Sequence, residues 1–142
     1  LNVDSVHKRK ALRDVLEKFA TDKPCIIFCN RKKDISLLVD SLKKHGYKAG
    51  GLHGDLAQSA RGETVKQFKE GSLKILVASD IASRGLDVEN LSLVVNFDIP
   101  YQVEDYVHRI GRTGRAGQEG IAVSLVSIHD QKAWKAVEKS ID

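Results

Sequence analysis

The segment from His108 to Arg115 reads HRIGRTGR and carries arginines at every third position, with no acidic residue among them. Guanidinium groups so close together repel one another, so they need an acidic protein group or an external anion to neutralise them. The planar guanidinium fork suits phosphate oxygens, which it binds in a bidentate manner. Gly111 and Gly114 allow the backbone to turn tightly between the arginines. The pattern therefore favours a phosphate-binding segment over a solvated basic loop.

A second polar segment, ASDIASRGLD, runs from Ala78 to Asp87 and leaves a predicted strand. Ser79 offers a hydroxyl and backbone N–H groups to a phosphate. Gly85 lets the backbone approach a ligand beside Asp87, whose carboxylate can accept a hydrogen bond from a ribose hydroxyl. Serine followed by aspartate after a strand is equally typical of an ordinary helix cap. Both interpretations stay open for this segment taken alone.

A third segment, LHGDLAQSAR, runs from Leu52 to Arg61. Gly54 can bring the backbone close to a ligand, and the helix that follows presents the positive end of its dipole. Gln58 and Arg61 lie one turn apart on that helix, where side chains and dipole together could hold an anion. The alternative is a capped helix with a surface arginine.

Several catalytic patterns are absent from the sequence. None of the 11 glycines precedes a lysine, so the phosphate loop G-x-x-x-x-G-K-[ST] is missing, and no DEAD-like acidic cluster could hold Mg²⁺. The histidines have no metal-ligand spacing, and no Ser-His-Asp arrangement is indicated, so we expect no metal site. The chain should not hydrolyse a nucleoside triphosphate unaided.

Length and composition predict one globular domain over residues 1–142. The chain is 42% apolar and has a net charge of +4, which is compatible with a polyanionic partner. Its apolar runs are too short to cross a membrane, and it opens with no signal peptide, so we expect a cytoplasmic protein. Cys25 and Cys29 match no redox or zinc motif and are predicted to be small buried residues. The first residue, Leu1, is not methionine, which favours a domain of a longer protein.

Apolar runs alternate with apolar residues at helical spacing along the chain, which predicts an α/β fold of three layers, with a mostly parallel sheet between helices. Polar residues follow the expected strands, and in such sheets ligands bind at the carboxyl ends of the strands. The last helix, with Trp134, Val137 and Ile141, should cover the sheet. The expected strands are 25–29, 49–52, 75–78, 93–97 and 121–127; the expected helices are 6–20, one that ends at Gly46, 57–70, 103–110 and one that opens at Asp130.

Over essentially its whole length the chain resembles the C-terminal RecA-like domain of DEAD-box ATP-dependent RNA helicases, whose motifs it carries in order. Ser79 and Arg31 stand where the family usually has threonine, and the CNRKKD and ASD forms are similar to bacterial members. The matching segments are Ile26–Arg31 (motif IV), Gln58–Arg61 (the Q-x-x-R motif), Ser79–Asp87 (motif V), Val95–Asp98 (motif Va) and His108–Arg115 (motif VI).

The resemblance implies roles for residues of four of these motifs and two partners, RNA and an N-terminal RecA-like domain of the same protein, with no membrane. ATP and its Mg²⁺ would be bound mainly by that N-terminal domain. A non-catalytic RecA-like module that binds RNA or protein, and a helicase domain that acts on DNA, stay as alternatives. The implied residues are Arg112 and Arg115 as arginine fingers, Gly85 and Asp87 at the nucleotide, His108 and Arg84 between domains, and Asn30, Arg31, Gly54, Gln58, Arg61 and Ser79 at RNA; Arg109 should pair with an acid.

Overall fold

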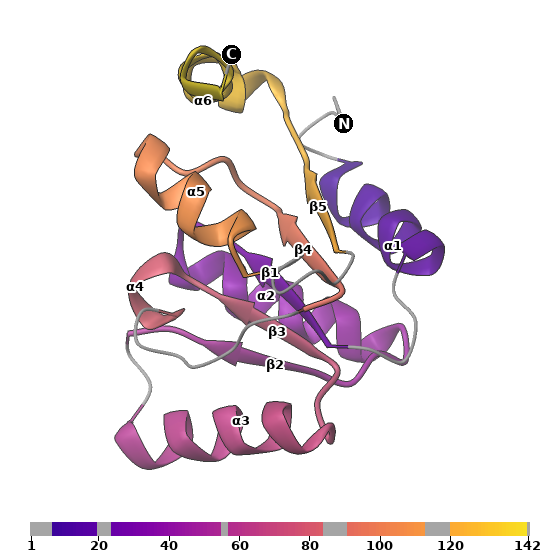
Figure 1. Ribbon diagram of the computed structural model, residues 1–142. Helices are drawn as coiled ribbons and strands as arrows, with labels where there is room; N and C mark the ends of the chain where they lie inside the picture. The colour runs from indigo at the N-terminus through magenta and orange to yellow at the C-terminus, as the bar shows by residue number, and fades with distance from the viewer. Residues whose placement is uncertain (1–6, 20–23, 55–56, 84–90, 113–119, 142) are drawn as a thin grey trace.

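The computed structural model describes residues 7–19, 24–54, 57–83, 91–112 and 120–141 (Figure 1). Within these ranges the strands form one sheet in the order β2-β3-β1-β4-β5, and every neighbouring pair is parallel. The expected parallel sheet is therefore confirmed. Its strands are β1 (Cys25–Phe28), β2 (Ala49–Leu52), β3 (Ile75–Ala78), β4 (Leu93–Asn96) and β5 (Ile121–Ser124).

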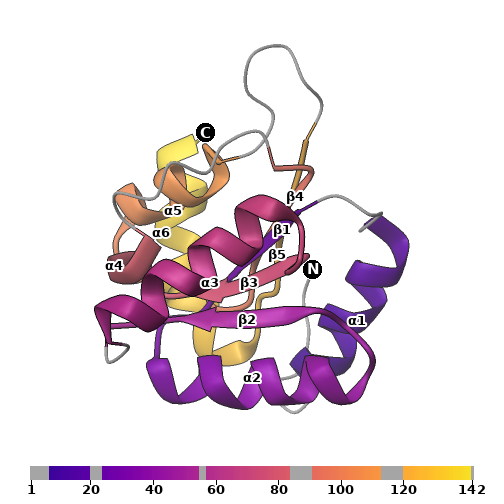
Figure 2. The same cartoon turned by 90° about the horizontal axis from the view of Figure 1, so that it is seen from below.

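Helices cover both faces of the sheet, which gives three layers (Figures 1 and 2). Apolar side chains of α1 and α2 pack on one face, and those of α3 and α4 pack on the other. Strands β1, β3 and β4 are buried along their whole length, as continuous apolar runs predict. None of the described helices is long and apolar enough to cross a membrane. The helices are α1 (Lys8–Phe19), α2 (Lys32–Lys44), α3 (Gln58–Glu70), α4 (Asp80–Ser83), α5 (Val103–Ile110) and α6 (Gln131–Ile141), with a 3₁₀ turn, η2 (Ile128–Asp130).

Two glycines explain how α2 joins the weakly apolar strand β2. Gly46 follows α2 with a φ of +87°, a left-handed conformation that favours glycine, so the expected end of this helix is confirmed. At Gly51 a Cβ atom would lie 3.1 Å from Ile35 Cγ2 and 3.3 Å from Val39 Cγ2. A larger residue there would push α2 away from the sheet.

The two cysteines are buried, as the sequence predicts. Cys25 begins β1 and Cys29 follows its last residue, and both are free thiols that are at most 1% exposed. Burial raises the pKa of both thiols well above the ordinary value. They act as small apolar side chains of the core.

The position of α6 corrects one expectation. Trp134 and Val137 do not cover the sheet; they pack with α5 in a separate apolar cluster, where the rings of Trp134 and Tyr106 meet edge to face at 6.0 Å. β5 ends at Ser124, before the expected residue 127, and Val126 beyond it packs with apolar residues of α5 and α6, which keeps α6 beside α5 (Figure 1). The side chain of Ile141 lies outside the described residues. The consequence is that α6 supports α5, the helix that carries Arg109.

Candidate functional site

Arg109 on α5 is one of the most buried side chains of the protein. It is only 1% exposed, and its guanidinium makes two parallel bonds of 2.7 Å, from Nε and Nη2 to the two carboxylate oxygens of Asp80. Asp80 opens α4 directly after β3 and Ser79. The expected pairing of Arg109 with a nearby acid is therefore confirmed.

The remaining donors of Arg109 are also used inside the protein. Nη1 donates to the carbonyl oxygen of Asp98 at 2.6 Å and to Asn96 Oδ1 at 3.3 Å, and Nη2 donates to Asn30 Oδ1 at 2.8 Å. The guanidinium carbon lies 5.1 Å from the centre of the Phe28 ring. A guanidinium has five N–H donors. Since all of them have protein acceptors, Arg109 has none left for an external phosphate.

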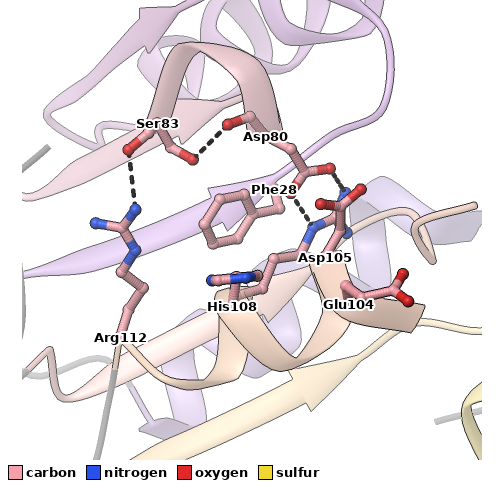
Figure 3. Close-up of a pocket in the computed structure, with 8 residues that line it drawn as sticks. Phe28, Asp80, Ser83, Glu104, Asp105, His108 and Arg112 are labelled. Carbon is pink, nitrogen blue, oxygen red and sulfur yellow. Dashed lines mark hydrogen bonds and ion pairs between the residues drawn. The ribbon is translucent and has the colours of Figure 1, made fainter. Parts of the chain in front are cut away.

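Arg112 has a different environment, three residues further on and just beyond α5. It is partly exposed and lines a pocket of about 380 Å³ (Figure 3). Its Nη2 donates to the carbonyl oxygen of Ser83 at 2.9 Å, which places the guanidinium beside the end of α4. The pocket is lined by Phe28, Asp80, Ser83, Glu104, Asp105, His108, Arg109 and Arg112.

The pocket has charges of both signs. Glu104 and Asp105 lie in the first turn of α5, where carboxylates favour the positive end of the helix dipole. His108 and Arg112 are one turn apart, and Figure 3 shows the Arg112 guanidinium away from the two carboxylates, next to Ser83. An anionic ligand is therefore favoured on the Arg112 side of the pocket. Among the described residues, no cluster of histidine, cysteine, aspartate or glutamate is placed to hold a metal ion.

The residues expected at RNA lie at the carboxyl edge of the sheet. Gly54 is exposed two residues beyond β2, Gln58 is the exposed first residue of α3, and Arg61 is half-buried one turn later. Arg31 is exposed at the start of α2. Figure 1 shows the start of α3 at the same edge of the sheet as α4 and α5. The structure thus places these residues at one edge of the sheet.

Two of the expected RNA residues already have partners within the protein. Ser79 Oγ accepts a hydrogen bond of 3.3 Å from the backbone N–H of Ala82, so the helix-cap interpretation of this segment holds. The side-chain amide of Asn30 accepts from Arg109 and donates to the carbonyl oxygen of Ile99 at 2.9 Å. Of the remaining expected site residues, Arg84, Gly85, Asp87 and Arg115 lie outside the described residues.

A second charged cluster, which the sequence reasoning missed, lies at the other end of the same edge. Lys8, the first residue of α1, is only 6% exposed. Its Nζ donates to the carbonyl oxygen of Phe97 at 2.7 Å and to Asp130 Oδ2 at 2.8 Å, and it lies 3.4 Å from Asp98 Oδ1. One lysine therefore ties α1 to the end of β4 and to the turn before α6.

The carboxylate of Asp130 should make stability depend on pH. Burial alone would raise its pKa, but hydrogen bonds from Lys8 and Ser127 outweigh burial and hold the pKa below its ordinary value. A carboxylate with a lowered pKa contributes stability above its unfolded-state pKa, and this contribution is lost as pH falls through the folded-state pKa. We expect Asp130→Asn to flatten the decrease in unfolding free energy below about pH 4, measured by urea denaturation.

Asp14→Asn is the matched control, because Asp14 forms an exposed pair with Lys10 on α1. Its pH dependence should stay parallel to that of the unaltered chain. A curve for Asp130→Asn that is also parallel would contradict the role of this carboxylate.

The parallel sheet covered by helices on both faces, with polar residues at its carboxyl edge, defines the chain as a RecA-like α/β domain. Residues 7–117 match the helicase conserved C-terminal domain family, and the chain belongs to that family. Within it the chain is of the DEAD-box type, as its relatives show. The ATP-dependent RNA helicase DbpA of Bacillus subtilis is 42% identical over 143 residues, which cover 99% of this chain and 29% of that protein.

Solved structures give the same result. The Escherichia coli DEAD-box protein SrmB, solved with the regulator of ribonuclease activity A, matches with a TM-score of 0.89 at 36% identity, over 99% of this chain and 83% of that one. The C-terminal domain of the DEAD-box protein Dbp5 matches with a TM-score of 0.87 at 34% identity, over 99% and 83% of the two chains. The chain spans less than a third of the curated relatives it matches.

Proposed function

We propose that this chain is the C-terminal domain of an ATP-dependent RNA helicase, in which it supplies arginine fingers for ATP hydrolysis and half of the surface that binds the RNA backbone. The observation that carries the proposal is the contrast between two arginines of one motif. Arg109 uses every donor inside the protein, whereas Arg112 lines a pocket at the sheet edge. The first arginine builds the site, and the second faces the ligand.

In this proposal ATP and its Mg²⁺ are bound mainly by an N-terminal RecA-like domain that docks on the pocket. Arg112 and Arg115 approach the γ-phosphate, where their charge balances the charge that develops during phosphoryl transfer. Gly85 and Asp87 contact the nucleotide, and His108 and Arg84 contact the N-terminal domain. The chain itself holds no phosphate loop, so hydrolysis requires both domains.

RNA lies along the same edge in this proposal, with its sugar-phosphate backbone against Gly54, Gln58 and Arg61. Arg31, Ser79 and Asn30 complete the path, and Asn30 contributes mainly by holding the backbone in place, since its amide is engaged at both ends. Contacts to the backbone carry little sequence information, and their affinity falls with added salt. ATP and RNA together close the two domains, one strand of a short duplex is bent away, and hydrolysis reopens the enzyme.

The test compares the purified 142-residue chain with the full-length protein. We expect no ATPase activity from the chain alone and only weak RNA binding, because the phosphate loop lies elsewhere. The full-length protein should hydrolyse ATP and be stimulated by RNA more than by DNA of the same sequence. The measurement is phosphate release with and without each nucleic acid.

Each of the other possible results would favour a different function. Robust hydrolysis by the chain alone would overturn the division of labour between domains. Equal or stronger stimulation by DNA would favour a DNA helicase, and RNA binding by a full-length protein that has no ATPase would favour a non-catalytic RNA-binding module.

A further inference from the structure

We propose that Lys8 is a positioning residue for the RNA-binding segment Asn30–Arg31, through the carboxylate of Asp98. The inference rests on the proposed function and assigns a role to a residue outside the helicase motifs. Lys8 lies 22 positions before Asn30 in the sequence and is only 6% exposed. Its influence would pass through one shared carboxylate.

The two oxygens of Asp98 have different partners. Oδ1 lies 3.4 Å from the Lys8 ammonium, and Oδ2 accepts a hydrogen bond of 2.9 Å from the backbone N–H of Asn30. Asn30 directly precedes Arg31, the exposed residue just before α2. Asp98 therefore holds the backbone at the point where β1 gives way to α2, and Lys8 holds Asp98.

Lys8 also separates two acids. Its Nζ lies 2.8 Å from Asp130 and 3.4 Å from Asp98, and the side chains of these acids are only 12% and 20% exposed. Without the ammonium, two poorly solvated carboxylates would face each other, which is strongly unfavourable. The repulsion between them is reduced at the lowest free-energy cost if one carboxylate turns towards water.

A cavity gives Asp98 room to turn. A polar pocket of about 320 Å³ lies beside the cluster and is lined by Lys8, Arg31 and Asp98 among others. If Asp98 turns into this pocket, the N–H of Asn30 loses its acceptor, and the backbone that leads into Arg31 is no longer held. Asp130 is less free to turn, because its Oδ2 also accepts from the backbone and hydroxyl of Ser127.

Asn30 also connects this cluster to Arg109 and Asp80, beside the proposed nucleotide pocket. The Asn30 side chain accepts a bond from Arg109, which in turn holds Asp80 at the start of α4. Arg109 keeps four other acceptors when Asn30 shifts, so its own position changes little. The expected defect is therefore in RNA affinity, with little change in the catalytic step.

The test uses Lys8→Met in the full-length protein, with Lys10→Met as the matched control, because Lys10 lies on the same helix in an exposed pair with Asp14. RNA-stimulated ATPase is measured across RNA concentrations, well below the melting temperature of each variant. We expect Lys8→Met to raise the KM for RNA about tenfold with kcat within about twofold, because RNA binding would then have to restore the Asp98–Asn30 geometry, at a cost of roughly one charge-assisted hydrogen bond. Lys10→Met should match the unaltered enzyme.

Asp98→Asn is the second variant, because it keeps the shape of the side chain and removes the charge that needs Lys8. It should raise the KM for RNA about threefold or more, and in its background Lys8→Met should have a smaller effect. A merely structural role would lower the melting temperature and leave the KM for RNA unchanged. That result in Lys8→Met, or in Asp98→Asn if Lys8→Met does not fold, would overturn the inference.

The outcome for the unaltered enzyme separates the two proposals. A full-length protein without RNA-stimulated ATPase overturns the proposed function, and this inference with it. A stimulated enzyme whose KM for RNA is the same in Lys8→Met and Lys10→Met overturns this inference alone.

Discussion

Replacing Arg112 with alanine is expected to lower the RNA-stimulated ATPase of the full-length protein by about a hundredfold or more, because an arginine finger is generally worth 10³ to 10⁵ in phosphoryl transfer. Arg112 lines the pocket and makes a bond of 2.9 Å to the Ser83 carbonyl oxygen. The loss should appear in kcat, because the charge that Arg112 balances develops during the reaction. The measurement is steady-state phosphate release at saturating ATP and RNA.

Two further variants make the Arg112 result specific. Arg9→Ala removes an exposed arginine of α1, outside the pocket, and should leave kcat unchanged. Arg112→Lys keeps the charge but loses the planar fork, so we expect only partial activity. If Arg112→Ala keeps near-normal kcat while folded, the pocket is not the catalytic one.

Arg109→Leu should instead destabilise the fold, by roughly 3–5 kcal/mol, because breaking a buried ion pair leaves an uncompensated charge. The change removes both 2.7 Å bonds to Asp80 and leaves Asn30 Oδ1 and the Asp98 carbonyl without this donor. Such a loss is a large part of the total stability of a typical domain. Urea denaturation of the chain, followed by circular dichroism, measures it.

The partner substitution tests whether the buried charge is the cause. Asp80→Asn in the Arg109→Leu background should recover part of the lost stability, giving a coupling of about 1 kcal/mol or more in a double-mutant cycle. Additive losses would show that the pair acts only by packing. A loss below about 1 kcal/mol for Arg109→Leu alone would contradict the role given to this guanidinium.

Most of the scaffold could be predicted because its signals are local. A continuous apolar run marks β1, helical spacing marks α2, and Gly46 ends α2 as expected. The main error concerned α6, whose apolar stripe is the same whether it covers a sheet or another helix. The choice between the two depends on tertiary packing, and strand ends such as that of β5 depend on long-range pairing that a sequence window does not contain.

For the candidate site, too, the features that could be predicted are those formed by residues close together in the sequence. The motif around Arg112 could be found because its arginines are close in sequence, whereas Lys8 and its acids are about 90 and 122 positions apart. One signal was available: Lys8 precedes Leu12 by four residues and so continues the apolar stripe of α1. A charged residue on a buried stripe needs a buried partner. The sequence alone did not reveal which acid that partner was.

The helical connections that follow two neighbouring strands lie on opposite faces of the sheet, and this arrangement determines where a ligand can bind. The connection after β1 passes through α2 on one face, and the connection after β3 enters α4 on the opposite face. Open sheets of this kind usually receive their ligand in the crevice where connections part in this way. In this domain the guanidinium of Arg109 occupies that position, where it is hydrogen-bonded to Asn30 after β1, Asp80 after β3 and Asp98 after β4. In the proposed function, a nucleotide at this edge would therefore lie outside the Arg109 guanidinium, in the pocket that Arg112 lines, and the N-terminal domain would supply the opposite wall.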